Sequence, residues 1–84
     1  MKRVLVTGAT GYVGGRLVRN LLEKGYKVRV FVRDEKKVTQ YAWVNDVEIA
    51  VGNVTDYQAT RKALDGIYVA FYLLHSIKIG RAHV

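Results

Sequence analysis

Apolar residues recur along this chain with two different spacings, one typical of strands and one typical of helices. Short apolar or alternating runs predict strands at Arg3–Thr7, Lys27–Val32, Val47–Val51 and Ile67–Leu74. Apolar residues at helical spacing predict helices at Tyr12–Lys24, around Lys36–Val44, and from the capping residue Asp56 to Leu64. Strands that alternate with helices in this way predict a parallel sheet joined by right-handed crossovers.

The last predicted strand, Ile67–Leu74, is almost wholly apolar, which is typical of an interior parallel strand covered on both faces. We expect the strand order 3-2-1-4. A doubly wound sheet usually needs more than these 84 residues, and the crossover helix that should follow Leu74 is missing. The fold class is therefore α/β, and we expect the incomplete N-terminal part of a doubly wound parallel sheet, with the pattern βαβαβαβ.

Three glycines, Gly8, Gly11 and Gly14, follow the first strand, and the first helix begins among them. They would let the backbone turn off the strand, let a phosphate approach closely and let the helix pack against the strand. Unpaired N–H groups and the helix dipole favour an anion at such a helix start. The pattern predicts a Rossmann turn for a dinucleotide pyrophosphate; the alternative is a turn that serves close packing alone. The expected cradle, which offers mainly backbone N–H groups, is Thr10, Gly11, Tyr12 and Val13.

Two charged residues, Arg33 and Asp34, follow the second predicted strand, where the adenosine ribose of such a cofactor would lie. An acidic residue there usually binds the 2′-hydroxyl of NAD, whereas an arginine accommodates the 2′-phosphate of NADP. Arg33 comes first after the strand, and Asp34 is placed to cap the next helix. We therefore expect NADP rather than NAD; the alternative is an exposed pair without a ligand.

Three segments together resemble the atypical short-chain dehydrogenase/reductase superfamily, in its NmrA-like, NAD-dependent epimerase/dehydratase-like branch. The segment Thr7–Gly14 looks like the Thr-Gly-x-x-Gly-x-x-Gly fingerprint of the superfamily. The segments Gly52–Asp56 and Tyr72–Ser76 are similar to the Gly-Asp-Val-x-Asp and Tyr-Leu-Val-His-Ser segments of the branch. The resemblance runs from Lys2 to about Ile77.

The resemblance implies roles for residues after the last two strands. Asn53 and Val54 would line the adenine pocket, although an aspartate usually stands in place of Asn53. Asparagine keeps a carbonyl acceptor but loses the charge, and its alternative role is an Asx-turn. Leu74 would lie on the ribose and nicotinamide side of the cofactor.

No catalytic residue is predicted. The resemblance implies a Tyr-x-x-x-Lys pair farther along a complete chain, and none of the six tyrosines here has lysine four residues on. Two functions follow from the resemblance. One is the NAD(P)-binding part of an oxidoreductase or epimerase with an unknown small-molecule substrate, and the other is a non-catalytic NAD(P)-sensing regulator.

The composition and the charge argue against several other classes of protein. The chain has no cysteine, so neither a disulfide framework nor a thiolate metal site is expected. The net charge of +7 comes from scattered basic residues without a recognition signature, so we expect no nucleic-acid partner. No apolar run approaches the length of a membrane span, and Met1 leads directly into the first strand. We therefore expect a cytoplasmic protein without membrane contact.

The last residues do not continue the pattern. Residues 79–84 read Ile-Gly-Arg-Ala-His-Val, which is the translation of part of a widely used DNA-sequencing adaptor. We interpret residues 78–84 as a non-native tail and residues 1–77 as a truncated NAD(P)-binding domain. The alternative is a natural surface tail.

Overall fold

The computed structural model describes residues 2–73 and places four parallel strands in one sheet. The strands are β1 (Arg3–Thr7), β2 (Lys27–Val32), β3 (Glu48–Val51) and β4 (Val69–Tyr72). Their order in the sheet is β3-β2-β1-β4, as the sequence predicted, so β1 pairs with both β2 and β4. The fold is α/β and forms part of a doubly wound sheet.

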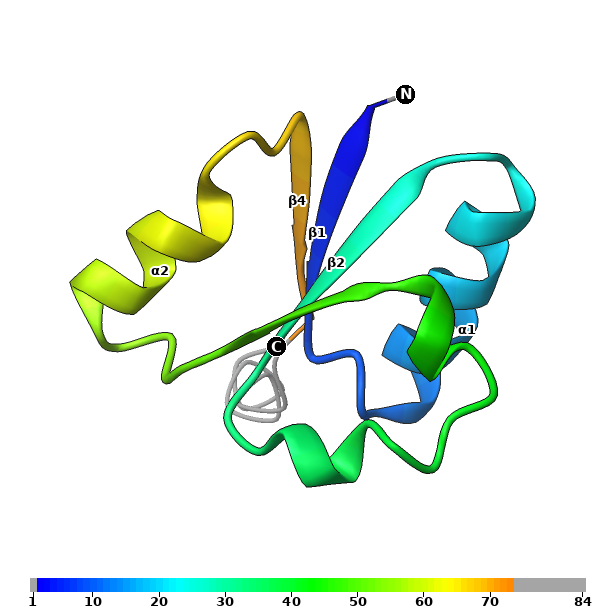
Figure 1. Ribbon diagram of the computed structural model, residues 1–84, viewed down its shortest axis with the longest axis horizontal. Coiled ribbons are helices and arrows are strands. Elements are labelled where there is room, and N and C mark those ends of the chain that lie inside the picture. The colour runs from blue at the N-terminus through cyan, green and yellow to red at the C-terminus, as the bar shows by residue number, and fades with distance from the viewer. Residues whose placement is uncertain (1, 74–84) are drawn as a thin grey trace, which may run out of the picture.

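Two α-helices, α1 (Tyr12–Glu23) and α2 (Tyr57–Leu64), cover opposite faces of this sheet (Figure 1). Alternation along β1 explains the two faces, because successive side chains of a strand point to opposite sides. Val4 and Val6 pack with Val18 of α1 in the larger core cluster. Leu5 instead packs with Phe31 and with Ala63 of α2.

The strand boundaries differ from prediction at β3 and β4, while those of β1 and β2 agree. β4 is shorter than the predicted Ile67–Leu74 because Ile67 N–H still donates to the Leu64 carbonyl, 3.0 Å away, in the turn that ends α2. Pairing with β1 extends slightly beyond the strand, since Tyr68 N–H donates to Arg3 and Leu73 N–H donates to Thr7. Leu74 lies outside the described residues.

The predicted helix around Lys36–Val44 is wrong. The segment between β2 and β3 forms two short 3-10 turns, η1 (Glu35–Lys37) and η2 (Val44–Asp46), with irregular chain between them. Tyr41 stacks on Trp43, with ring centroids 4.8 Å apart and an angle of 14° between the ring planes. Residues two apart on an α-helix do not face each other, so this stacking requires a non-helical backbone. Trp43 is buried in the core, as is Val38.

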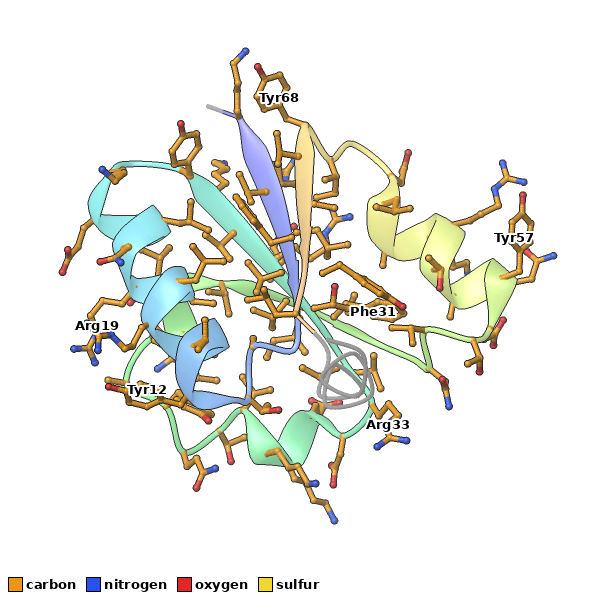
Figure 2. The ribbon with its side chains drawn as sticks, turned by 180° about the vertical axis from the view of Figure 1, so that it is seen from behind. Tyr12, Arg19, Phe31, Arg33, Tyr57 and Tyr68 are labelled. Atoms are coloured by element: carbon orange, nitrogen blue, oxygen red, sulfur yellow. The ribbon has the colours of Figure 1, made fainter. Side chains whose placement is uncertain are left out.

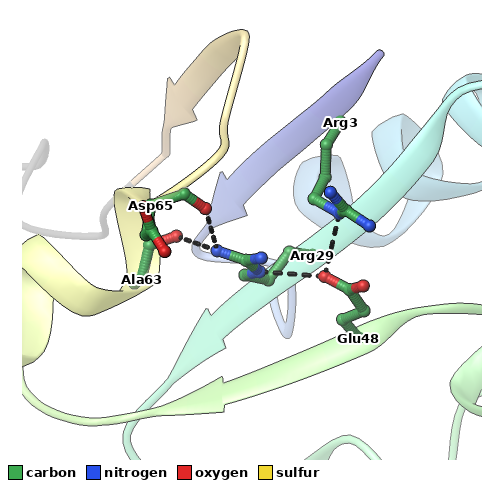
Figure 3. A network of polar contacts seen from close by, with 5 residues as sticks. All are labelled: Arg3, Arg29, Glu48, Ala63 and Asp65. Atoms are coloured by element: carbon green, nitrogen blue, oxygen red, sulfur yellow. Dashed lines mark hydrogen bonds and ion pairs between the residues drawn. The ribbon is translucent and has the colours of Figure 1, made fainter. Parts of the chain in front are cut away.

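A polar network joins β1, β2 and β3 to α2 (Figure 3). Arg29 donates to Glu48, 3.0 Å away, and to the carbonyl oxygens of Ala63 and Asp65 at 2.7 and 2.9 Å. Arg3 Nε lies 3.3 Å from the same Glu48 oxygen, as an ion pair without a hydrogen bond. The hydrogen bond from Arg29, aided by the charges of Arg3, Arg29 and Lys27, lowers the pKa of Glu48 despite some opposing desolvation. This network links β2 to the end of α2.

Within residues 2–73, no helix is both long enough and apolar enough to span a membrane.

Candidate functional site

The turn between β1 and α1 is fixed by two of its glycines. Gly8 has φ +88°, and a Cβ built on it would lie 1.5 Å from the carbonyl oxygen of Leu73. A Cβ on Gly14 would lie 2.1 Å from the carbonyl oxygen of Gly8. Glycine is therefore required at both positions, since any side chain would push the turn away from the end of β4 or push α1 away from the turn.

Gly11 is different because its backbone does not require glycine. As the N-cap residue of α1 it has φ −88° and ψ 170°, which any residue adopts. Its N–H donates to the Gly8 carbonyl oxygen, 3.1 Å away, and its carbonyl accepts from Gly15 N–H at 2.9 Å. The N–H of Gly11 is thus already engaged, and any free donors of the turn come from its other residues.

The N-terminus of α1 is exposed and carries no side-chain cap. The N-cap residue, Gly11, offers no side-chain hydrogen bond to the first N–H groups of the helix, and the first turn holds no acidic residue. Among residues 2–73, no acceptor bonds to the N–H of Tyr12 or Val13, and these side chains are 78% and 64% exposed. Unpaired N–H groups at the positive end of a helix dipole favour an anion.

Thr10, in the same turn, is held by a residue distant in sequence. The Tyr41 hydroxyl donates to the Thr10 carbonyl oxygen at 2.7 Å. The Tyr41 ring also covers the start of α1, since a Cβ on Gly15 would lie 3.4 Å from Tyr41 Cε1. Nothing local in the sequence links this tyrosine to a turn that lies 31 residues earlier, so sequence reasoning missed the contact.

Arg33 and Asp34 follow the carboxyl end of β2 and make different contacts. Arg33 is exposed and forms no ion pair within the described part of the chain, whereas the Asp34 carboxylate accepts from Lys36 N–H at 3.0 Å and caps η1. The capping role predicted for Asp34 is confirmed. Figure 2 shows Tyr12 and Arg33 at one end of the molecule, far from Tyr68 at the other end.

Asn53 and Val54 follow β3 and are already used locally. The Asn53 side-chain oxygen accepts from the N–H of Thr55 at 3.0 Å and from its hydroxyl at 2.9 Å. This is the Asx-turn that the sequence left as an alternative, and it occupies the oxygen expected to face adenine. Val54 is half-buried and packs against the cluster of Leu5, Phe31 and Ala63.

The predicted residues within the described part of the chain follow the carboxyl ends of the strands, at one edge of the sheet. Gly8, Arg33 and Asn53 come shortly after the carboxyl ends of β1, β2 and β3, and Leu73 follows β4 beside Gly8. After β1 the chain adds β2 and β3 on one side of β1, and then adds β4 on the other side. Open α/β sheets bind ligands in the crevice at such a reversal of strand order, which here lies between β1 and β4. Leu74, the remaining predicted residue, lies outside the described part of the chain.

Two hollows of the surface lie away from these residues. One, of about 570 Å³, lies between β3 and α2 and is lined by Ala50, Ala59 and Lys62, among others; another lies between α1 and Trp43. Neither is lined by a predicted site residue. Within residues 2–73, no three histidine, aspartate or glutamate side chains gather to hold a metal ion.

Comparison with known proteins supports one family. The model of the NmrA-like family matches residues 1–83. A 3 beta-hydroxysteroid dehydrogenase/Delta 5-->4-isomerase of Mycobacterium tuberculosis is 36% identical over 77 residues, which are 92% of this chain and 20% of that protein. The chain spans about a fifth of the length of the curated relatives it matches.

Solved structures share the fold. The structure of AtPrR2 with NADP+ and (+)pinoresinol matches 93% of this chain and 27% of its own, with a TM-score of 0.77 and 25% identity. A short-chain dehydrogenase/reductase superfamily protein from Agrobacterium tumefaciens, with bound NAD, matches 86% of this chain and 20% of its own, with a TM-score of 0.65 and 32% identity.

Proposed function

The chain belongs to the NmrA-like family, and from this premise we propose that it binds a nicotinamide dinucleotide at the carboxyl edge of its sheet. The N–H groups of Tyr12 and Val13 bind the pyrophosphate, and Thr10 and Gly11 shape the turn beneath it. Gly8 and Gly14 hold this turn against β4 and α1. The similar solved structures that contain NADP+ and NAD support this class of ligand.

The observation that carries the proposal is the uncapped start of α1. Helix N-termini are usually satisfied by a side chain, by water or by a ligand. Serine, aspartate or asparagine caps a helix well, yet this cap position holds glycine in a conformation that any residue could adopt. Phosphate oxygens supply the missing acceptors and benefit from the helix dipole.

We propose NADP rather than NAD on the evidence of Arg33. Its guanidinium is exposed at the end of β2, and planar guanidinium groups bind phosphates with two parallel hydrogen bonds. Asp34, which would favour the 2′-hydroxyl of NAD, already caps η1.

The remaining predicted residues are assigned to the adenine and nicotinamide ends of the cofactor. We propose that Val54 contributes an apolar wall beside adenine and that Asn53 contributes its amide N–H₂, because its oxygen is bonded to Thr55. Leu74, immediately after the segment that pairs with β1, is proposed for the nicotinamide side.

For the longer protein we propose an oxidoreductase or epimerase that acts on a small organic molecule. The bound nicotinamide supplies hydride transfer, while this segment binds and orients the cofactor. The name of the 36% identical relative, a hydroxysteroid dehydrogenase, supports an oxidoreductase. The alternative is a non-catalytic NAD(P)-sensing protein, and oxidation or reduction of substrate by the longer protein would distinguish the two.

The test replaces the cap glycine with a residue that caps better. In Gly11→Asp the carboxylate accepts the free N–H groups and complements the dipole, so α1 becomes more stable by about 0.3–1 kcal/mol. The same carboxylate occupies the proposed pyrophosphate site and repels phosphate. We therefore expect NADPH binding to the 84-residue chain to be lost, while the melting temperature stays the same or rises.

Binding is followed by NMR titration, which detects weak ligands at individual amides. The control is Ala70→Asp, which adds the same carboxylate at an exposed position of β4. A Gly11→Asp variant that is folded and binds NADPH as the original chain does would contradict the proposal.

A further inference from the structure

Tyr41 links the segment after Arg33 to the glycine turn. It lies between η1 and η2, and its hydroxyl donates to the Thr10 carbonyl oxygen at 2.7 Å. This contact joins the two parts of the chain assigned above to the ribose and to the pyrophosphate.

The contact completes the fixation of one peptide plane. The carbonyl of Thr10 and the N–H of Gly11 belong to the same planar peptide group. The N–H donates to Gly8, 3.1 Å away, and the carbonyl accepts from Tyr41. Both polar groups of the Thr10–Gly11 peptide, immediately before α1, are therefore held by hydrogen bonds. These bonds fix the direction in which α1 starts. They thereby also fix the direction of the N–H groups of Tyr12 and Val13.

The Tyr41 ring is itself held in place by packing. It stacks on Trp43 at 4.8 Å, and Trp43 is only 5% exposed. The ring also lies beside Gly15 of α1, where a Cβ would come to 3.4 Å from Tyr41 Cε1. The hydroxyl is thus oriented before any ligand arrives, so ligand binding does not need to order it.

We propose that Tyr41 is a positioning residue for pyrophosphate binding, a role that rests on the proposed function. Tyr41 does not contact the cofactor in this proposal. Its hydroxyl neutralises part of the negative charge on the Thr10 oxygen beside the anion site and keeps the turn in its binding conformation. Ligands that contain a pyrophosphate therefore depend on this hydroxyl, and ligands that lack one do not.

The test removes the hydroxyl and keeps the ring. Affinities of ADP, NADPH and adenosine for the 84-residue chain and for Tyr41→Phe are measured by NMR titration. We expect ADP and NADPH to bind about 3- to 10-fold more weakly to the variant, as for the loss of one neutral hydrogen bond, with adenosine unchanged. The control is Tyr26→Phe, which removes the hydroxyl of a tyrosine that is 38% exposed and forms no side-chain hydrogen bond within the described residues.

The other outcomes separate this proposal from the one on which it rests. If the original chain binds neither ADP nor NADPH, the proposed function is overturned, and the role of Tyr41 with it. If the original chain binds both and Tyr41→Phe binds them equally well, only the role of Tyr41 is overturned. An equal loss for adenosine and ADP would show that Tyr41 is structural and would also overturn the positioning role.

Discussion

The three glycines of the turn between β1 and α1 have different structural roles, although they are evenly spaced in the sequence. Gly8 and Gly14 are required by close contact with backbone atoms, because a Cβ on either would overlap a carbonyl oxygen. Gly11 meets no such conformational requirement, which makes it the informative glycine for ligand binding.

Alanine substitution separates these tasks. Gly8→Ala adds a Cβ 1.5 Å from the Leu73 oxygen at φ +88°, so we expect a loss of more than about 3 kcal/mol in the free energy of unfolding. Gly11→Ala needs no backbone change and should cost about 1 kcal/mol or less, as a weaker cap. Urea denaturation followed by circular dichroism measures both values, and equal losses would contradict this division of roles.

We expect Arg33 to decide the preference between NADP and NAD at the proposed site. A charge-assisted hydrogen bond contributes about 1.5–3 kcal/mol, so Arg33→Ala should remove about a 10-fold or greater preference for NADPH over NADH. Arg19→Ala is the control, since Figure 2 shows Arg19 on α1 and well away from Arg33. Calorimetric titration measures the affinities, and equal binding of the two cofactors before mutation would disprove the preference.

At the scale of elements, α2 depends on a contact with β2. Arg29 donates to two carbonyl oxygens at the carboxyl end of α2, where helical carbonyls lack partners and a positive charge is favourable. The same guanidinium donates to Glu48 of β3, so one side chain joins three elements.

Removing this guanidinium should loosen α2. We expect Arg29→Met to lower the free energy of unfolding by about 1–3 kcal/mol, because a half-buried side chain and two carbonyls lose their partners. Arg61→Met is the matched control, because Arg61 is exposed on α2 itself. Thermal unfolding compares the two, and similar melting temperatures for both variants would contradict a bridging role for Arg29.

Glu48 should give a small pH dependence to stability. The Arg29 hydrogen bond and the neighbouring positive charges lower the pKa of Glu48 in the folded chain below its ordinary value of 4.5. Its contribution is therefore complete above pH 4.5 and is lost as the pH falls through the folded pKa. The side chain is 49% exposed, so we expect less than about 1 kcal/mol.

Glu48→Gln isolates this contribution. The variant should be slightly less stable than the original chain at pH 7, and the difference should disappear at low pH. Urea denaturation across this range measures the difference in the free energy of unfolding, and a constant difference would contradict the linkage to Glu48.

At the scale of the whole molecule, β4 is an edge strand within the described residues, since it pairs only with β1 there. Val69 and Tyr72 are 39% and 66% exposed, and exposed strand edges favour association. We expect the 84-residue chain to self-associate and Val69→Lys to reduce this association.

Sedimentation velocity at several concentrations measures the effect. Tyr57→Lys is the control, because it places the same charge on an exposed apolar residue of α2 rather than on the edge. A chain that stays monomeric at every concentration would contradict this prediction.

We propose that residues 78–84 are not native to the protein. Their deletion should then change neither the melting temperature nor the affinity for NADPH, because a foreign tail has no partner surface selected for it. A loss of several kcal/mol on deletion, measured by urea denaturation, would show instead that the tail belongs to the folded domain.

The sequence alone determined the features that depend on neighbouring residues. Alternation and apolar runs placed β1 and β2, and strand–helix alternation gave the parallel order. The caps at Asp34 and Asp56 were predicted because a capping side chain bonds N–H groups only two or three residues away. The segments Thr7–Gly14, Gly52–Asp56 and Tyr72–Ser76 resembled the NmrA-like family, which the comparison confirmed.

Only the tertiary structure decided the features that depend on distant contacts. Stacking of Tyr41 on Trp43 replaced the helix predicted between β2 and β3 with irregular chain. The Tyr41–Thr10 hydrogen bond spans 31 residues, and the contact that requires glycine at position 8 involves Leu73 at the far end of the described chain. Periodicity and propensity describe a residue and its close neighbours in sequence, whereas these partners become neighbours only when the sheet and its connections are folded together.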